Sequence, residues 1–450
     1  MILSGLFPNG PFIRRALLIL AVLALPPLSR AQKMYSLEDA VRTAVENNAD
    51  LEVARLEMRK AGQQVRQAWG NAMPSLDFTA RYTRAIKKPV FFLPDFGDSA
   101  SNEVTPIEIG SNHSVDMGFT ATQVLFNSVV FIGVGTAAIY EKASRENYRA
   151  QYNKTFAAAE RAYYSVLLAE QVLTMTKASL TNAEDNLRNV KILNTQGIVS
   201  DYDLIRAEVQ VENVRPMVLE AERNVAVSLN GFKMALGLPA MEKIGITGNL
   251  EFTPADSSLV ENPDLVEQNA SLRALDYQKE IADKLITVNR SEYLPTISAF
   301  GNYQWQAQKN TLNIGPSDLI KTSQVGVSLN LNLFNGFQTT ARVGQARSDL
   351  HKVQEQASQL REVLKTQVQS ILLRLQEAER RIRSQQRTVE LAEKSFKIAT
   401  TRYKTGSGTQ LEVNDADVSL LRARLNRVQA IYDYLVAKSE LEEILCQHQL

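Results

Sequence analysis

The 450-residue sequence contains a single cysteine, Cys446, close to its C-terminus. One thiol cannot form a disulfide within the chain, so packing has to hold the folded state together. We interpret Cys446 as a residue of the C-terminal tail that has no consequence.

The sequence has no excess of positive charge. Three of its 50 basic residues and none of its 49 acidic ones lie in residues 1–31, so the rest of the chain is slightly acidic. A nucleic-acid-binding protein would carry a basic excess, and the balance argues against that class.

Long apolar runs are also missing. The run from Ala16 to Leu25 has ten residues, whereas a helix needs roughly 20 to cross a bilayer. Two arginines precede this run, and the small-residue site Ser29-Arg30-Ala31 follows it. This order predicts that residues 1–31 form a cleavable secretory signal, with a mature chain from Gln32. No cysteine follows the cleavage site, so we expect no lipid anchor there.

Residue patterns of an enzyme are absent as well. The three histidines, His113, His351 and His448, have no spacing typical of metal ligands. Gly406-Ser407-Gly408 lacks the flanking pattern of a hydrolase nucleophile and is better explained as a turn between helices. We therefore expect no catalytic residues, no metal and no cofactor.

Glycine and proline are missing from two long stretches, residues 136–196 and 345–405. Each is about 60 residues long and predicts a helix of about 90 Å. In the second stretch, apolar or small residues recur at steps of three and four, which is a coiled-coil seam that requires neighbouring helices. The seam consists of Ala346, Leu350, Val353, Ala357, Leu360, Leu364, Ile371, Leu375, Ala378, Ile382, Val389, Ala392, Phe396, Ala399 and Tyr403.

The two stretches belong to an internal repeat. A shift of 221 positions places Pro74 on Pro295, and a shift of 209 places Gly197 on Gly406. The difference in length lies chiefly in one loop, near residues 84–114. Two halves of about 200 residues indicate a duplicated module rather than a solenoid, whose units recur every 20–50 residues.

Each half also contains two segments in which apolar and polar residues alternate. About ten residues of such alternation are typical of a tilted, membrane-spanning strand, although a half-buried sheet of a soluble domain shows the same pattern. The segments lie at about 75–84, 114–125, 296–306 and 322–333, and we expect Lys87–Gly110 and Ala307–Ile320 to be their longer, outward-facing loops.

Four membrane strands cannot close a barrel, and an open edge in lipid leaves backbone groups unsatisfied. The chain must therefore oligomerise if these strands span a membrane. Two copies would give eight strands and a filled interior, whereas three would give twelve and leave a passage.

Several short motifs recur in a fixed order along the chain. They are "VLFN" at 124–127, "ALGLP" at 235–239, "NLFNG" at 332–336 and the two glycine turns at Gly197 and Gly406. With these motifs the sequence resembles the TolC family of outer-membrane efflux and secretion channels over nearly all of the mature chain. The resemblance implies a mainly α-helical homotrimer with a twelve-stranded β-barrel in the bacterial outer membrane. A long α-helical barrel would continue from it through the periplasm.

The expected organisation combines the repeat with this resemblance. It comprises a signal peptide at 1–31, a first repeat at 32–240 with its long helix at about 128–196, an equatorial linker at 241–261, and a second repeat at 262–450 with its long helix at about 338–405.

The resemblance also implies partners. Substrate would arrive from an inner-membrane transporter through a periplasmic adaptor protein, and the adaptor would meet the tips of the helical barrel. The matching tip residues are Gly197, Ile198, Val199, Gly406, Ser407 and Gly408.

A gate at these tips is implied in the same way. The family's closing tyrosine matches Tyr403, and its acidic partner matches Asp203, whereas Gly408 stands where the family has an arginine. Glu412 and Asp415 match an acidic pair whose spacing of three places both carboxylates on one helix face.

A secreted or surface-attached coiled-coil protein with a structural or adhesive role is the alternative. That class would explain the two long helices. It would not explain four alternating segments at matched positions in the two halves.

Overall fold

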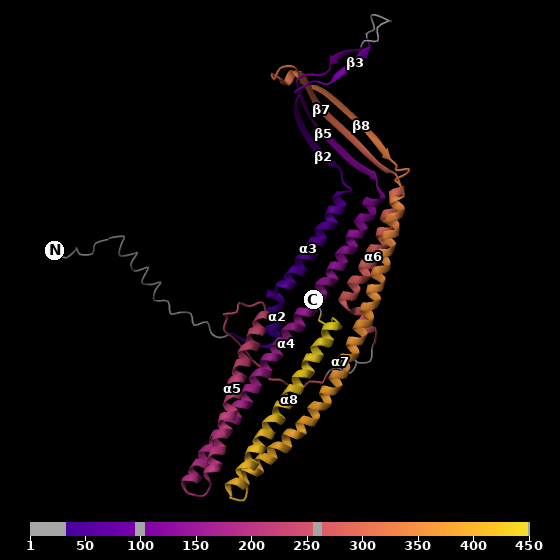
Figure 1. The fold of residues 1–450 in the computed structure, drawn as a ribbon. Helices are drawn as coiled ribbons and strands as arrows, with labels where there is room; N and C mark the ends of the chain where they lie inside the picture. Colours follow the sequence, from indigo (N-terminus) through magenta and orange to yellow (C-terminus); the bar gives the residue numbers. More distant parts are fainter. Residues whose placement is uncertain (1–32, 95–103, 255–262, 449–450) are drawn as a thin grey trace, which may run out of the picture. The chain divides into compact units, whose positions relative to one another are not determined.

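Two very long helices dominate the chain, α4 (Ser128–Thr195, 68 residues) and α7 (Gln338–Lys404, 67 residues). The computed structural model describes residues 33–94, 104–254 and 263–448 (Figure 1). The expected signal, residues 1–31, and the last part of the expected linker, residues 255–261, lie outside this range. Most described residues are helical, which confirms the predicted helical majority.

The remaining elements follow the order helix, strands, long helix, shorter helix in each half. They are β1 (Lys33–Tyr35), α2 (Leu37–Asn47), α3 (Ala49–Gly70), β2 (Ser75–Arg84), β3 (Val90–Pro94), β4 (Val104–Glu108), β5 (His113–Phe126), α5 (Asp201–Ala235), β6 (Ile244–Ile246), η2 (Pro263–Gln268), α6 (Ala270–Arg290), η3 (Ser291–Tyr293), β7 (Thr296–Lys309), η4 (Pro316–Asp318), β8 (Ile320–Asn330) and α8 (Gln410–Ile444).

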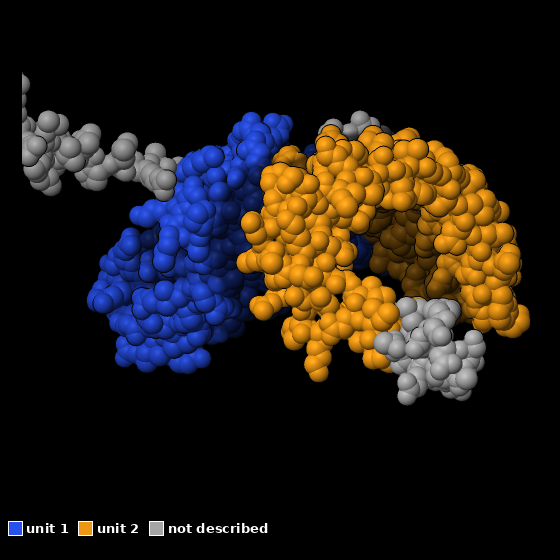
Figure 2. Space-filling model, turned by 90° about the horizontal axis from the view of Figure 1, so that it is seen from above, with its two compact units in different colours: residues 1–49, 152–261, 368–443 blue, residues 50–151, 262–367, 444–450 orange. Residues whose placement is uncertain are grey.

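The chain forms two compact units, coloured separately in Figure 2. Unit 1 comprises residues 1–49, 152–261 and 368–443, and unit 2 comprises residues 50–151, 262–367 and 444–450. Both long helices run from one unit into the other. Every residue of the α7 seam is buried or half-buried. No helix in the described parts of the chain has an apolar stretch long enough to cross a membrane.

Unit 2 contains a four-stranded antiparallel sheet in the order β2-β5-β7-β8. The helices join the strands at one end of this sheet, and loops join them at the other (Figure 1). Seen from above, unit 2 curves around a hollow (Figure 2). Within the described chain, β2 and β8 each pair with one strand only, so both sheet edges are open.

The two faces of this sheet differ in polarity, because successive side chains of a strand point to opposite faces. The register places Phe78, Phe119 and Tyr303 on one face, together with Val325 and Leu329. These side chains are exposed, and Val325 reaches 90% exposure. The other face carries Asp77, Thr79 and Arg81 of β2, and Asn302, Gln304, Gln306 and Gln324 of the second half.

The segment Lys87–Gly110 is not a plain loop, which corrects the expectation from the sequence. It contains strands β3 and β4, which pair with each other in a separate two-stranded sheet. The run Val90-Phe91-Phe92 is apolar without alternation, so its strand could not be recognised by a period of two. Phe91 and Phe92 are both exposed.

In unit 1 the N-terminal strand β1 pairs in parallel with β6, from the segment expected to be a linker. Gly237 of the "ALGLP" motif, which follows α5, lies against the end of α2 with a φ of +68°. A Cβ atom at this position would lie 2.5 Å from the carbonyl oxygen of Asn47, so the close approach of the two backbones requires glycine.

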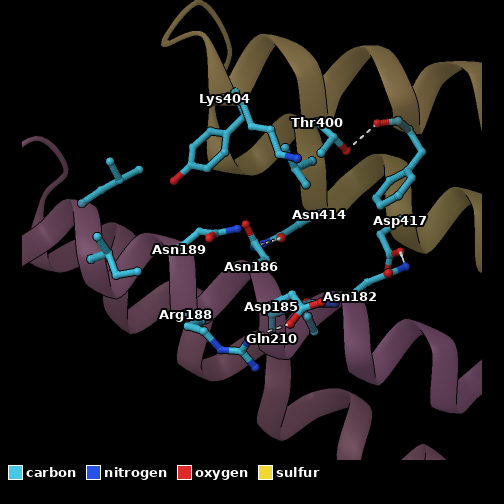
Figure 3. A pocket seen from close by; sticks show the side chains of 16 residues that line it. Asn182, Asp185, Asn186, Arg188, Asn189, Gln210, Thr400, Lys404, Asn414 and Asp417 are labelled. Carbon is cyan, nitrogen blue, oxygen red and sulfur yellow. Dashed lines mark hydrogen bonds and ion pairs between the residues drawn. The ribbon is translucent and has the colours of Figure 1, made fainter.

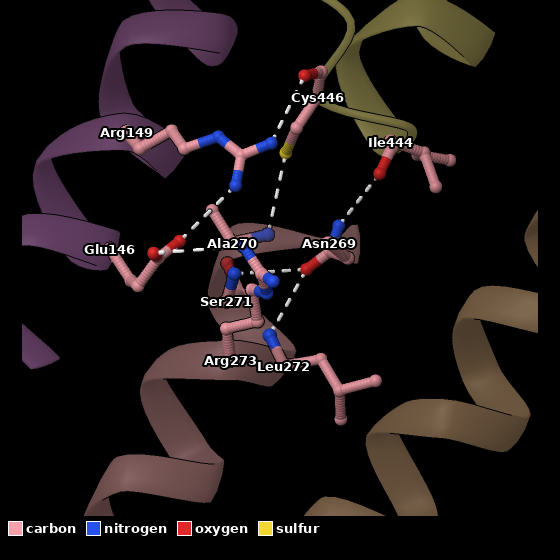
Figure 4. Close-up of polar contacts among 9 residues, drawn as sticks. All are labelled: Glu146, Arg149, Asn269, Ala270, Ser271, Leu272, Arg273, Ile444 and Cys446. Carbon is pink, nitrogen blue, oxygen red and sulfur yellow. Dashed lines mark hydrogen bonds and ion pairs between the residues drawn. The ribbon is translucent and has the colours of Figure 1, made fainter. Parts of the chain in front are cut away.

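Ile444 and Cys446, near the C-terminus, lie against the start of α6 (Figure 4). Asn269 caps α6 by accepting from the backbone N–H of Leu272 (3.1 Å), and its amide donates to the carbonyl oxygen of Ile444 (2.8 Å). Cys446 is buried, and its sulfur accepts from the N–H of Ala270 (3.4 Å). The prediction that Cys446 is an inconsequential tail residue is therefore wrong as regards packing.

One buried acid makes the stability of unit 1 depend on pH. Burial raises the pKa of Glu160 in α4 to about 7; a hydrogen bond from Ser439 of α8 opposes the shift, and the charge of Glu442 adds to it. One carboxylate oxygen of Glu160 has no partner among the described residues. An acid whose pKa is raised by folding destabilises the fold as pH rises from the unfolded value of 4.5 to the folded value.

We predict that Glu160→Gln stabilises the protein at pH 8 and has little effect at pH 4. The gain at pH 8 should be on the order of 3 kcal/mol, because the penalty for the buried charge reaches its full value only above both pKa values. Thermal unfolding of both proteins across this range measures the difference. An equal shift at both pH values would show that Glu160 does not titrate in this way.

Candidate functional site

The sharpest reversals of the chain in unit 1 are two glycine turns. Gly197 joins α4 to α5 with a φ of +70°. The N–H of Gly197 donates to the carbonyl of Asn194, and the N–H of Ile198 donates to that of Leu193, both at 2.9 Å. This pattern ends a helix with a residue in the left-handed region, where glycine carries no steric cost.

The turn between α7 and α8 has the same construction. Gly406 has a φ of +74°. Its N–H donates to the carbonyl of Tyr403 (3.1 Å), and the N–H of Ser407 donates to that of Arg402 (2.9 Å). The matched positions of Gly197 and Gly406 in the repeat therefore correspond to matched backbone geometry.

The helix that follows each turn begins with a side-chain cap. The hydroxyl of Ser200 accepts from the N–H of Asp203 (3.2 Å) and donates to its carboxylate (2.7 Å). In the second turn, the hydroxyl of Thr409 accepts from the N–H of Glu412 (3.3 Å). Asp203 and Glu412 thus occupy equivalent positions in the first turn of the returning helix, where acidic residues are favourable.

The first turn exposes much more apolar surface than the second. Ile198 is 66% exposed, and Tyr202 and Ile205 of α5 are 69% and 58% exposed. Val199 is half-buried, whereas Ser407 is exposed and polar. Ile198 is one of the tip residues predicted from the sequence, whereas Tyr202 and Ile205 are not; their spacing of three places them on one helix face.

Gly408 is held against the end of α7. A Cβ atom at this position would lie 3.0 Å from Cβ of Arg402 and 3.1 Å from the backbone nitrogen of Tyr403. The arginine that the resemblance implies therefore does not fit here without a shift of the turn. Arg402 brings a guanidinium group to the turn instead, and its Nη2 donates to the carbonyl of Ser407 (3.0 Å).

Tyr403 and Asp203, the two residues expected to form a latch, lie close together but share no hydrogen bond. Burial, and then the charge of Asp203, raise the pKa of Tyr403. The hydroxyl of Tyr403 is buried and has no partner among the described residues. A buried hydroxyl without a hydrogen-bond partner costs free energy, so an acceptor close to this group would stabilise the structure.

The two carboxylates of the expected acidic pair have different surroundings. Glu412 lies 3.4 Å from Arg402 across the turn, and Asp415 is exposed. Arg402, which precedes Tyr403, is not among the residues predicted from the sequence. Glu412 is therefore partly neutralised within its own chain, whereas Asp415 has no ion pair with any described residue.

Behind the turns lies an open cleft of about 680 Å³, lined mainly by polar side chains of α4, α7 and α8 (Figure 3). Its most buried acid is Asp417 of α8, which is 7% exposed. Asp417 accepts from the hydroxyl of Ser179 (2.7 Å) and the amide of Asn182 (3.0 Å), both on α4. This polar contact connects the α4–α5 hairpin with the α7–α8 hairpin. The pattern of the sequence does not predict it.

Comparison with known sequences decides the family. Residues 40–238 and 256–447, one segment in each half, match the profile described as outer membrane efflux protein. The chain belongs to the outer membrane efflux protein family. It therefore acts at the outer membrane as a channel for efflux or secretion.

Individual proteins of the efflux family are similar to this chain in sequence and in fold. The sequence is 22% identical to outer membrane protein TolC of Vibrio cholerae over 94% of this chain and 93% of that one. It is 23% identical to the alkaline protease secretion protein AprF of Pseudomonas aeruginosa, over 71% of this chain and 67% of that one. The crystal structure of VceC, an outer membrane protein of V. cholerae, has the same fold. Its TM-score is 0.75 at 16% identity, covering 91% of this chain and 95% of that one.

We predict that Asp417→Ala destabilises this channel protein by about 2 kcal/mol, because Ser179 and Asn182 would lose their shared acceptor in a buried place. Asp415→Ala, two residues away and exposed, is the matched control and should change stability little. Thermal unfolding of the two variants measures the contrast. Equal stability of both variants would show that the bridge to Asp417 contributes nothing.

Proposed function

We propose that three copies of the chain form one outer-membrane duct that carries substrates from the periplasm to the exterior. The observation that supports this most is the pair of open sheet edges, β2 and β8. In lipid, each unpaired backbone group on such an edge costs several kcal/mol, and pairing with a neighbouring copy removes that cost.

The geometry of the strands favours three copies. β2 and β8 run antiparallel to their neighbours, so β8 of one copy can continue the sheet with β2 of the next. Three four-stranded sheets make a twelve-stranded barrel. Its apolar face would meet lipid, and its face of asparagine, glutamine and threonine would line a wet passage.

The helices would extend this passage into the periplasm. The α4–α5 and α7–α8 hairpins expose apolar side chains in a single chain, among them Val209 (52%) and Leu391 (51%). Hairpins of neighbouring copies can cover such side chains. In this proposal the helical barrel is a passage and takes part in no enzymatic step and binds no cofactor.

We further propose that the two glycine turns form the periplasmic tips and meet an adaptor protein that connects the duct to an inner-membrane transporter. Gly197, Ile198 and Val199 would supply the apolar part of that surface, and Gly406, Ser407 and Gly408 the polar part. The exposed Ile198 and Tyr202 support this assignment, since exposed apolar clusters mark interaction surfaces.

We predict that Ile198→Asp combined with Tyr202→Asp abolishes export while the trimer stays intact. Two charges would have to be desolvated in the adaptor interface, but neither side chain is buried in the free chain. Asn230→Asp is the control, because Asn230 is also exposed on α5 but is polar and lies far along the helix from the turn. Efflux and secretion are measured in the native host after deletion and re-supply of the gene. Normal export by the double variant would remove the docking proposal.

The gate would lie just inside these tips. The hydroxyl of Tyr403 is buried and has no hydrogen-bond partner among the described residues. In the closed gate it would donate a hydrogen bond to Asp203 of a neighbouring copy. Threefold symmetry would gather Glu412 and Asp415 of all copies around the passage. Crowded carboxylates attract cations, and Asp415 should contribute most because Glu412 already faces Arg402.

In planar bilayers, Tyr403→Phe with Asp203→Ala should raise the conductance, because it removes the latch. Glu412→Gln with Asp415→Asn should abolish block by divalent cations applied from the tip side, and Asp415→Asn alone should account for most of the effect.

Asp185→Asn serves as the control for the gate variants, since Asp185 is an exposed acid on α4 that pairs with Arg188. It should conduct and select like the parent. If both double variants also behave like the parent, the gate lies elsewhere. If the parent itself does not conduct, the duct proposal is wrong.

A further inference from the structure

The loop end of the sheet carries a row of basic residues on its apolar face. Arg84 at the end of β2 is the register partner of His113 in β5, and His113 is the partner of Lys309 in β7. Lys321 in β8 pairs with Trp305 in β7. Because side chains alternate along a strand, all of these residues share the face of Tyr82 and Tyr303.

Aromatic rings follow the basic residues along the same face, from Tyr82 next to Arg84 to Phe78 further along β2. The ring centroids of Phe78 and Phe119 are 5.0 Å apart, and those of Tyr303 and Trp305 are 4.7 Å apart. The hydroxyl of Tyr82 lies 2.7 Å from Nδ1 of His113. Aromatic belts mark the level at which a membrane-spanning strand meets the lipid headgroups.

The charge on this face is all of one sign. The apolar face of the four strands carries no acidic residue, and its other end, around Leu76, Ile297 and Leu329, has no charge at all. Lys309 is neutralised by Asp318, 2.6 Å away in η4. Arg84 and Lys321 are exposed and form no ion pair with any described residue.

Closure of the barrel would bring these two free cations together. β2 and β8 are the opposite edges of the sheet, and the register places Lys321 level with Ala80 and Arg84 four residues nearer the loops. At each subunit junction, the long side chains of Arg84 of one copy and Lys321 of the next would therefore both extend over the loop end of the junction. Like charges on paired strands destabilise a sheet. An anion bound between them would offset this repulsion and would accept a charge-assisted hydrogen bond from each side chain.

We propose that Arg84 and Lys321 bind, at each junction of the trimer, one phosphate-bearing headgroup of an outer-leaflet lipid. The long stems of both side chains lie along apolar surface and place their charges at headgroup level. Arginine and lysine are the residues that best recognise phosphate. The lipid then strengthens the contact between two copies. This inference rests on the proposed trimer and on the loop end of the sheet facing outward.

The test uses purified trimers in detergent and measures the temperature at which they dissociate, with and without lipid A, a diphosphorylated acylated disaccharide. Lipid A should raise the dissociation temperature of the parent by several degrees. Dephosphorylated lipid A and inorganic phosphate should each have no effect.

Arg84→Gln combined with Lys321→Gln should lose the protection by lipid A, and Arg84→Lys combined with Lys321→Arg should keep it. The matched control is Arg81→Gln, on the same strand but on the opposite face, where Arg81 is the register partner of Asp116. It should be protected like the parent.

Equal protection of the Gln double variant, or equal protection by the dephosphorylated lipid or by inorganic phosphate, would overturn the proposal. Conductance separates this result from failure of the duct. A conducting trimer that lipid A does not protect contradicts only the lipid site, whereas a parent that neither trimerises nor conducts contradicts both.

Discussion

Backbone hydrogen bonding in lipid is the constraint on which the rest of the molecule depends. A helix satisfies its own backbone groups, but a sheet does so only when it closes. The chain supplies four strands, of which β2 and β8 have an open edge. In the proposed trimer, neighbouring copies pair these edges, and lipid covers the apolar face that includes Val325, at 90% exposure.

The helices follow the same logic outside the membrane. A helix of 68 residues such as α4 cannot bury an apolar stripe alone. Within one chain it gains partners through turns that reverse the direction at Gly197 and Gly406. Polar contacts such as that of Asp417 with Ser179 then connect the two hairpins. These contacts lie near the proposed gate, and their hydrogen bonds fix which side chains of the two hairpins face each other.

Local patterns in the sequence were sufficient to predict the long helices, the four strands of the sheet and the faces of these elements. The alternation after Pro74 and Pro295 coincides with β2 and β7, and the seam from Ala346 to Tyr403 is buried or half-buried throughout. Such patterns could not predict which helices contact each other. Asp417 and Ser179 are 238 positions apart, and a helical period does not reveal which helix a face will meet. The run at Val90 was missed because it does not alternate, and Arg402 because its role depends on the path of the turn.

Cysteine cross-linking between the open edges tests the central claim most directly. In a Cys446→Ser background, Thr79→Cys in β2 is combined in turn with a cysteine at Thr322, Gln324 or Ser328 of β8, all on the polar face of the sheet. The account predicts that oxidation of membrane-embedded protein gives, for at least one pair, a covalent species of three chains and nothing larger. Monomer alone for every pair, or an open ladder of larger species, would contradict closure by three copies.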